Sequence, residues 1–315
     1  MSARIVMRLT VVEAVATTPE VVRLTFAHPQ RPELPAWEPG AHVDLRLPDG
    51  RTRQYSLCGD PADRSRYVLA IKREDAGRGG SLWTHDNLTP GAVAHVSHPR
   101  NNFGLAVEAR RHVLIGGGIG VTPLAAMAWY LAARGADFVI HLCARSAENA
   151  PLLAELQALC GERLHCWFSS EGSRFDPAAL GAPEDGVHIY ACGPQRLIDA
   201  VQVTLETAGW PVEQVHVEHF APMADENYKP EPFDALIAST GAVVHVPADV
   251  SLLDVLRRHG FAMPSSCEIG VCGSCECGYR DGTVIHRDVV LPVAKRQDRM
   301  MPCVSRARVN ITLEL

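Results

Sequence analysis

The cysteine spacing toward the end of the chain constrains its fold more than any other feature. Cys267 is followed after four residues by Cys272 and after two more by Cys275, and Cys303 follows at a distance. This C-x4-C-x2-C…C spacing is that of the plant-type thiolate ligands of a 2Fe-2S cluster. Four thiolates satisfy two tetrahedral irons bridged by sulfides, and the distant fourth ties the loop to its domain. We therefore predict an iron–sulfur cluster held by these four cysteines.

Two alternatives for this loop stay open. The first is a structural zinc site, although zinc sites usually draw on two Cys-x-x-Cys or Cys-x-x-His pairs and only one such pair occurs here. The second concerns Cys277, because strand alternation would place it on the same side as Cys275, so a swap of ligands is conceivable. The x4-x2 spacing favours Cys275, and we interpret Cys277 as a buried thiol. Gly270 and Gly273 should allow tight turns that direct N–H groups toward sulfur.

The composition excludes several classes of protein. The chain has 315 residues, 47% of them hydrophobic, and a net charge of -6, so we expect a globular protein of two or three domains. The acidic balance argues against a nucleic-acid partner, and no apolar run of about 18 residues predicts a membrane span. Residues 1–10 lack the features of a signal peptide. We expect a cytoplasmic protein, where clustered cysteines hold metal rather than form disulfides.

Hydrophobic patterning divides the chain into three domains. Residues 1–107 alternate apolar and polar residues between turn signals, which predicts a small antiparallel β-barrel. Residues 108–222 alternate apolar strands with helix-length segments, which predicts an α/β domain with a parallel sheet. Residues 223–232 are polar and proline-rich and are interpreted as a linker. Residues 233–315, with a hairpin and a short helix before the cysteine loop, form the third domain.

Individual elements are expected as follows. Barrel strands are expected at 21–26, 43–47 and 68–72, and strands of the parallel sheet at 113–115, 138–142 and 187–191. Helices are expected at 82–88, 122–133, 151–160, 194–207 and 251–259, and the hairpin of the third domain at 233–238 and 242–246.

A glycine-rich turn follows the first expected strand of the parallel sheet. Gly118 and Gly120 lie between the strand that ends at Ile115 and the next helix, for which Thr122 is the expected N-cap and Pro123 the first helical residue. Backbone N–H groups at such a helix start can bind phosphate. The turn is not the G-x-G-x-x-G fingerprint, since Pro123 stands at the position of the third glycine. A phosphate-binding turn is one interpretation and an ordinary strand-to-helix turn is the other.

Two further segments carry groups suited to ligand binding. Cys192 and Gly193 follow the strand at 187–191, and loops at the carboxyl ends of parallel strands line the ligand crevice; a helix start with a buried thiol is the alternative. In the barrel, Arg53 and Tyr55 share one face of a short strand, and the glycine-rich turn at 77–81 opens a helix that can bind an anion. Together they suit a flavin nucleotide, whereas singly they could be a surface charge and a core aromatic.

The order of these motifs resembles the phthalate dioxygenase reductase family, and vanillate O-demethylase reductases look similar. The resemblance covers essentially the whole chain and rests on Arg53-x-Tyr55-Ser56, Gly77–Ser81, Gly118-x-Gly120-x-x-Pro123, Cys192-Gly193-Pro194 and the loop from Cys267 to Cys303. It implies a flavin-binding barrel, a parallel-sheet NAD-binding domain and a C-terminal β-grasp ferredoxin domain. The resemblance implies FMN as the flavin, and the C-terminal ferredoxin domain distinguishes this family from relatives that carry that domain at the N-terminus and use FAD. Cys277 departs from the usual pattern.

The resemblance also implies roles for particular residues. The FMN-binding residues would be Arg53, Tyr55, Ser56, Lys72, Gly79, Gly80 and Ser81, with Ser56 near flavin N5. The NADH-binding residues would be Gly118, Gly120, Thr122, Arg145, Ser146, Cys192 and Gly193. Cys192 would border the nicotinamide, and Phe220 would be the aromatic residue beside the flavin. With Ser56, these two residues form the expected catalytic set.

We therefore predict a flavoprotein oxidoreductase that serves an oxygenase in aromatic catabolism. Hydride would pass from NADH to FMN, and single electrons would leave through the 2Fe-2S cluster to a separate Rieske-type oxygenase that hydroxylates or demethylates a small aromatic compound. NADH is favoured over NADPH, although Arg145 could contribute to a pocket for a 2′-phosphate. The acceptor is expected to bind near residues 268–271, and the reductase is expected to be a monomer. The alternatives are an FAD reductase that feeds a haem-thiolate monooxygenase, a reductase of a separate ferredoxin, and a non-enzymatic zinc or redox-sensing protein.

Overall fold

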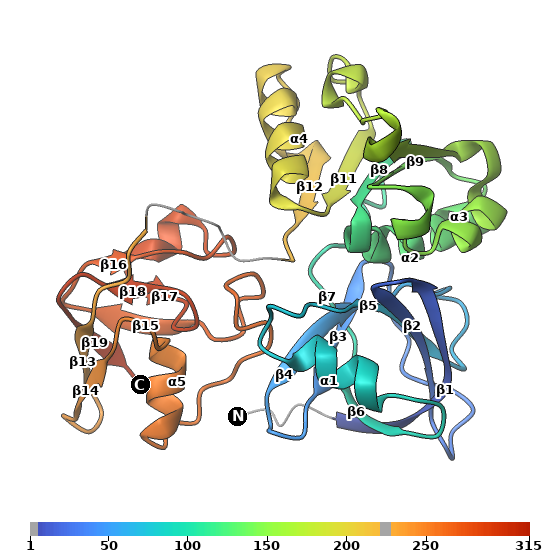
Figure 1. Cartoon of the computed structure of the whole chain (residues 1–315). Coiled ribbons are helices and arrows are strands. Elements are labelled where there is room, and N and C mark those ends of the chain that lie inside the picture. Colours follow the sequence, from blue (N-terminus) through green and yellow to red (C-terminus); the bar gives the residue numbers. More distant parts are fainter. Residues whose placement is uncertain (1–5, 221–227) are drawn as a thin grey trace. The chain divides into compact units, whose positions relative to one another are not determined.

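The computed structural model describes residues 6–220 and 228–315. The chain divides into two compact units, Met1–Phe220 and Ala221–Leu315, and each is described by itself (Figure 1). The first unit contains both the barrel and the parallel sheet, so the expected boundary between 107 and 108 stays a prediction. Of the expected linker, residues 223–227 lie outside the described residues. The rest belongs to the second unit, where Arg287 stacks on the ring of Tyr228 at 4.1 Å.

The first part of unit 1 is an antiparallel barrel. Its sheet has the order β4-β3-β6-β1-β2-β5, with β7 paired to β3. Leu57, just after β4, pairs with Leu69 of β5, which joins the two ends of the sheet. The elements are β1 (Val6–Thr18), β2 (Val21–Ala27), β3 (Ala41–Arg46), β4 (Thr52–Ser56), β5 (Tyr67–Lys72), α1 (Gly80–Asn87), β6 (Val93–Ser97) and β7 (Arg100–Asn101).

The second part of unit 1 is a five-stranded parallel sheet of order β10-β9-β8-β11-β12. Helices α2 and α3 pack on one face of the sheet and α4 on the other (Figure 1). The elements are β8 (Arg111–Gly117), α2 (Val121–Ala133), β9 (Asp137–Ala144), α3 (Leu153–Cys160), β10 (Leu164–Phe168), β11 (Val187–Cys192), α4 (Gln195–Thr207) and β12 (Val215–Glu218). Short 3-10 helices lie at Gly118–Gly120, Ala147–Asn149, Gly161–Arg163, Ser169–Glu171, Pro177–Leu180 and Val212–Gln214.

One hydrophobic core spans both parts of unit 1. Val21, Cys58 and Ala70 of the barrel are buried in the same cluster as Leu124 and other residues of α2. Burial of such apolar surface is the main driving force of folding. The shared core therefore accounts for the barrel and the parallel sheet forming a single unit.

Unit 2 contains a mixed sheet of order β14-β13-β19-β15-β17, with a small pair of β16 and β18. The central pair of β13 and β19 is parallel, and its neighbours on both sides are antiparallel. Helix α5 packs Leu252, Val255 and Leu256 into the core of this sheet. The elements are β13 (Phe233–Ile237), β14 (Val243–Val246), α5 (Leu252–Arg258), β15 (Cys277–Arg280), β16 (Val284–Ile285), a 3-10 helix (Val293–Gln297), β17 (Arg299–Met300), β18 (Arg306–Ala307) and β19 (Asn310–Glu314).

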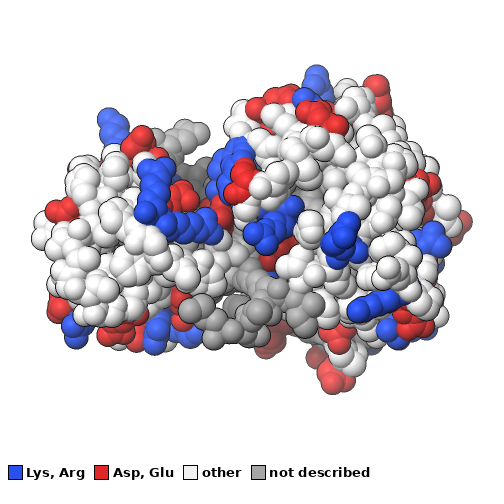
Figure 2. Space-filling model, turned by 90° about the horizontal axis from the view of Figure 1, so that it is seen from below, with Lys and Arg blue, Asp and Glu red and all other residues white. Residues whose placement is uncertain are grey.

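The surface and helix lengths add two observations. On the face drawn in Figure 2, Lys and Arg side chains lie interspersed with Asp and Glu side chains. Across the described ranges, 6–220 and 228–315, no helix is both long enough and apolar enough to span a bilayer.

Candidate functional site

The four cysteines predicted to hold a cluster lie together in unit 2 as two pairs. Cys275 Sγ lies 3.3 Å from Cys303 Sγ. The backbone N–H of Cys267 donates to Cys272 Sγ at 3.5 Å, and the N–H of Ile269 donates to Cys267 Sγ at 3.5 Å. Gly270 and Gly273 have φ values of 81° and 72°, so the expected tight turns are present. The loop thus directs peptide N–H groups at thiol sulfur, as its sequence predicted.

This arrangement fits a two-iron cluster better than a single metal ion. Each iron of a 2Fe-2S cluster takes two thiolates, and the chain presents two pairs of thiols. Within the described part of the chain, no group of three or more His, Cys, Asp or Glu side chains surrounds one metal-ion position. Within each pair, one thiol donates to the other, which lowers the pKa of Cys272 to about 5 and raises the pKa of Cys267. A four-coordinate structural zinc ion would require all four sulfurs around one point.

Cys277 differs from the ligand set in its surroundings. It begins β15 and packs in the core of the sheet with Tyr279, whereas Cys275 precedes the strand and packs in a separate cluster with Met301. Strand alternation therefore does not relate the two cysteines. Burial raises the pKa of the Cys277 thiol to about 12. These features agree with a thiol that belongs to the core.

The expected flavin-binding residues meet at the edge of the barrel. The side chain of Arg53, from β4, lies against Gly80, where an added Cβ would stand 2.7 Å from Arg53 Nε. Gly79 precedes α1 with φ of 78°, and the position of its missing Cβ is open. Burial raises the pKa of Tyr55, whose hydroxyl bonds to Thr84 of α1. A cation, helix N–H groups and an aromatic ring are thus combined, which fits the phosphate and ring of a flavin nucleotide.

Three other expected flavin residues border this group. Ser81 Oγ accepts a hydrogen bond from the backbone N–H of Glu74 at 3.0 Å. Lys72 Nζ pairs with Glu74 Oε1 at 2.7 Å, so this cation is already engaged by a carboxylate. Ser56 is 6% exposed and ends β4. Ser81 thus lies at the start of α1, Lys72 at the end of β5 and Ser56 at the end of β4, and their roles stay predictions.

The glycine-rich turn and the Cys192 turn pack against each other at the carboxyl edge of the parallel sheet. A Cβ on Gly120 would lie 2.4 Å from the carbonyl oxygen of Cys192. Gly118 has φ of 52° and open space where its Cβ would be. Both turns follow neighbouring strands, β8 and β11, where nucleotides bind in sheets of this kind. The backbone of the two turns thus forms a glycine-lined cradle at this edge, and its binding of a pyrophosphate stays a prediction.

The expected role of Thr122 as N-cap is wrong. Helix α2 begins at Val121, and a 3-10 turn (Gly118–Gly120) leads directly into it. Thr122 is therefore the second helical residue, and its hydroxyl donates to the carbonyl oxygen of Ile119 at 2.9 Å. The helical conformation extends toward the N-terminus as far as Gly120, which adopts right-handed helical dihedral angles. The proposed contact of Thr122 with NADH stays a prediction.

Glu218 is a buried carboxyl that the sequence did not single out. It ends β12 in register with Cys192 of β11. Its Oε2 atom is buried and has no hydrogen-bond partner among the described residues, and burial raises the pKa of Glu218 to about 8. Burial also raises the pKa of Cys192, which is 0% exposed. The signal in the sequence that could have identified Glu218 is a charged residue at the end of a strand whose carboxyl end lies at the ligand-binding edge of the sheet.

The remaining expected residues lie in unit 1 as follows. Phe220 packs against the core that contains Cys192, and its expected place beside the flavin stays a prediction. Arg145 is exposed just after β9, and Ser146 Oγ donates to Asn149 Oδ1 at 2.8 Å. These two residues lie at the same carboxyl edge of the sheet. Their contact with NADH stays a prediction.

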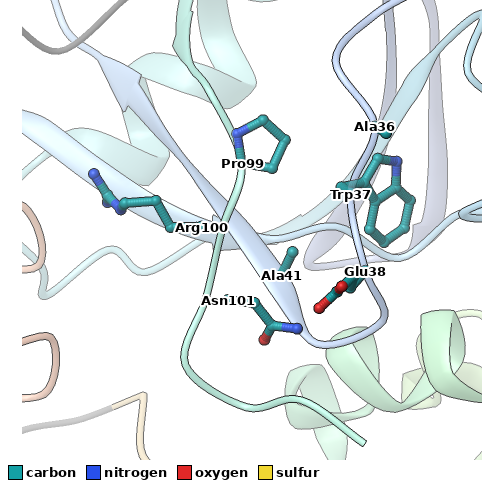
Figure 3. A pocket seen from close by; sticks show the side chains of 7 residues that line it. All are labelled: Ala36, Trp37, Glu38, Ala41, Pro99, Arg100 and Asn101. Atoms are coloured by element: carbon teal, nitrogen blue, oxygen red, sulfur yellow. The ribbon is translucent and has the colours of Figure 1, made fainter.

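The barrel also has a cavity of about 320 Å³ (Figure 3). It is lined by Ala36, Trp37, Glu38, Ala41, Pro99, Arg100 and Asn101. Arg100 pairs with the buried Asp44 at 2.7 Å. None of the expected cofactor residues lines this cavity, so it adds nothing to the candidate site.

Comparisons with known proteins identify the domain that contains the cysteine loop and the relatives of the whole chain. A family model described as the 2Fe-2S iron-sulfur cluster binding domain matches residues 236–308. The tert-butanol monooxygenase / tert-amyl alcohol desaturase reductase subunit of Aquincola tertiaricarbonis is 42% identical over 90% of this chain and 88% of its own. The heme-dependent oxidative N-demethylase beta subunit of Ectopseudomonas mendocina (strain ymp) is 41% identical over 87% of each chain.

A solved structure extends the similarity to all parts of the chain. The structure is that of phthalate dioxygenase reductase, titled a modular structure for electron transfer from pyridine nucleotides to 2Fe-2S. It matches with a TM-score of 0.81 at 34% identity and covers 98% of both chains. The barrel, the parallel sheet and the cluster-binding unit therefore occur in the same order in both proteins.

Proposed function

Because the chain belongs to the phthalate dioxygenase reductase family of flavin and 2Fe-2S reductases, we propose that it transfers electrons from NADH through FMN and the cluster to a Rieske-type oxygenase. The observation that carries the proposal is the match over 98% of phthalate dioxygenase reductase, combined with two pairs of thiols and a glycine cradle on one polypeptide. A protein that binds only zinc has no use for the cradle. The residues of both sites are therefore expected to work in sequence.

The residues of unit 1 would bind and orient the two organic cofactors. When bound, FMN can take a hydride from NADH and release its electrons singly to the cluster. Arg53 and the N–H groups at the start of α1 would hold the FMN phosphate, and Tyr55 would pack on the ring. The Gly118–Gly120 turn would hold the pyrophosphate of NADH. Cys192, buried at the edge of the sheet, would border the nicotinamide.

In unit 2, the residues would hold the exit site for electrons. Cys267 and Cys272 would bind one iron, and Cys275 and Cys303 the other. Peptide N–H groups of the loop would donate to sulfur and raise the reduction potential of the cluster. The acceptor is proposed to bind at residues 268–271. NADH is the proposed reductant, and comparison of the Michaelis constants for NADH and NADPH tests that choice.

The electron path is tested with Cys303→Ser. This variant should keep NADH-dependent reduction of ferricyanide, which the flavin can carry out, and should lose most cytochrome c reduction, because the second iron lacks a ligand. We expect at least a tenfold loss of cytochrome c reduction with ferricyanide reduction unchanged. Cys277→Ser is the matched control and should reduce both acceptors normally. Unchanged cytochrome c reduction by Cys303→Ser contradicts the proposed path.

A second candidate differs in the electron acceptor. The relative from Ectopseudomonas mendocina is named as part of a haem-dependent enzyme, which favours a haem-containing acceptor over a Rieske-type oxygenase. Stopped-flow mixing of the reduced reductase with each class of oxygenase tells the two apart. Faster oxidation of the cluster by a haem enzyme would support the second candidate.

For the final substrate we propose a small aromatic compound, as the name phthalate dioxygenase reductase suggests.

A further inference from the structure

A charged pair joins helix α5 to the cysteine loop. Arg257 Nη1 donates to Glu268 Oε1 at 2.8 Å. The Glu268 side chain is only 5% exposed, whereas that of Arg257 is 33% exposed. Ser265 Oγ donates to the same carboxylate oxygen at 3.2 Å and also bonds to Arg257 Nη2. Glu268 follows Cys267 directly in the sequence, so Arg257 contacts the residue next to the first proposed ligand.

We infer that Arg257 is a positioning residue for the cluster: through Glu268 it fixes the ligand loop and cancels a buried negative charge next to Cys267, a proposed ligand. The inference rests on the proposed set of four cysteine ligands. It does not depend on the identity of the electron acceptor or on the reductant.

The backbone of Glu268 supports the first part of this inference. Glu268 has φ of 57°, in the left-handed region that residues with a Cβ rarely adopt. This conformation occurs between Cys267 and Ile269, whose N–H donates back to Cys267 Sγ at 3.5 Å. Strained backbone of this kind persists only where the surroundings impose it. The bonds of the Glu268 carboxylate to Arg257 and Ser265 are side-chain contacts that help to impose it.

Helix α5 reaches both pairs of ligands. Arg257 contacts the loop of Cys267 and Cys272, and the backbone N–H of Leu253 donates to the carbonyl oxygen of Pro302 at 3.0 Å. Pro302 precedes Cys303, and Leu253 is buried in one cluster with Cys275 and Cys303. The helix begins at a Ser251 cap, where Ser251 Oγ accepts from the N–H of Asp254 at 3.0 Å. One short helix therefore holds the two halves of the site in place.

The charges of the pair support the second part of the inference, that Arg257 cancels a buried negative charge. A buried carboxylate without its partner is strongly unfavourable, because little solvent screens its charge. Near the cluster, the same uncompensated negative charge would disfavour the addition of an electron. Arg257 removes this penalty in the folded protein. The pair therefore keeps the potential of the cluster higher than Glu268 alone would allow.

The test compares two neighbouring arginines in the holoenzyme. Arg257→Met keeps the apolar stem and removes the charge, and Arg258→Met is the matched control because Arg258 is exposed on the same helix. The cluster potential is measured by dithionite titration with mediators, read from the paramagnetic signal of the reduced cluster. For Arg257→Met we expect a fall of about tenfold in the one-electron equilibrium, 59 mV. Arg258→Met should match the wild type.

A second readout follows loss of the cluster. Bleaching of the visible iron–sulfur absorption by an iron chelator should be several-fold faster in Arg257→Met than in the wild type. In the double variant Arg257→Met/Glu268→Gln it should be slower than in Arg257→Met, because no buried charge is left unpaired. If Arg257→Met cannot be purified with its cluster, Arg257→Lys, which keeps the charge, should bind the cluster and retain nearly the wild-type potential.

Two results would overturn the inference. One is that Arg257→Met equals Arg258→Met in both potential and rate of bleaching. The other is that the double variant loses its cluster as fast as Arg257→Met. Neither readout uses NADH, flavin reduction or an oxygenase, so failure here is separable from failure of the proposed electron path. Iron analysis of the wild type shows independently whether the four cysteines hold a cluster.

Discussion

At the scale of the residue, Glu218 is an ionisable group at the nucleotide-binding edge whose pKa is shifted by burial. Its Oε2 atom is buried without a partner among the described residues, and burial raises its pKa from an ordinary value of 4.5 to about 8. The folded protein therefore binds a proton between pH 4.5 and pH 8 that the unfolded chain releases. Stability that depends on this proton is complete below about pH 4.5 and falls as the pH rises toward 8.

We predict that Glu218→Gln removes this dependence on pH. Relative to the variant, the wild type should lose roughly 3–4 kcal/mol of unfolding free energy between pH 5 and pH 8. Urea unfolding of both proteins at several pH values measures the difference. The comparison must be between variants, because burial lowers the pKa of His112 to about 4 and so produces the opposite slope below pH 6.5. A constant difference across this pH range would show that Glu218 is ionised when folded.

At the scale of the element, the contact between two turns defines the proposed nucleotide cradle. Gly120→Ala would place a Cβ 2.4 Å from the backbone oxygen of Cys192. The new Cβ is fixed to the backbone of residue 120, and the atoms that it meets are backbone atoms of Cys192 and Gly193, so the clash cannot be relieved by a side-chain movement. We therefore expect a loss of about 1–3 kcal/mol of stability and weaker binding of NADH. Isothermal titration with NAD⁺ and urea unfolding measure the two effects.

Gly135→Ala is the matched control for this prediction. Gly135 follows α2 with φ of 61° and has open space around its missing Cβ. Its substitution should cost about 1 kcal/mol through backbone strain alone and leave affinity for the nucleotide unchanged. If Gly120→Ala binds NAD⁺ as tightly as Gly135→Ala does, the cradle does not hold the nucleotide.

The sequence predicted elements well where periodicity was regular and poorly where it was broken. The strand expected at 21–26 is present as β2 (Val21–Ala27), and the helix expected at 194–207 begins one residue later as α4. In contrast, β1 was not anticipated, because register shifts between Val11 and Glu13 interrupt its alternation of apolar and polar residues. The N-cap at Thr122 failed because the glycine turn continues into the helix.

The spacing of the site's cysteines along the sequence could be predicted, whereas contacts between residues far apart in the sequence could not. The spacing of Cys267, Cys272 and Cys275 is local, so the sequence alone indicated a cluster. The pairing of Arg257 with Glu268 depends on how α5 packs, and no sequence spacing predicts it. Likewise, Glu218 meets Cys192 only because β11 and β12 pair in parallel.

At the scale of the whole molecule, the hydrophobic cores predict how the protein unfolds. One core joins the barrel to α2 and the parallel sheet, whereas the cores of unit 2 are built from residues 233–315. Units without a common core unfold as separate cooperative transitions. Unit 1 should therefore unfold in one transition that includes barrel and sheet, and unit 2 in another.

Differential scanning calorimetry of the holoenzyme and of Cys303→Ser tests this division. Because a bound cluster stabilises only the folded form of the unit that holds it, loss of the cluster should lower the unit 2 transition alone. A unit of this size loses about 4–8 °C in Tm per kcal/mol, so the shift should be easy to resolve. The unit 1 transition, followed by release of flavin fluorescence, should stay within about 1 °C of the wild type. A single transition that moves as a whole would show that the two units share more of their stability than their separate cores imply.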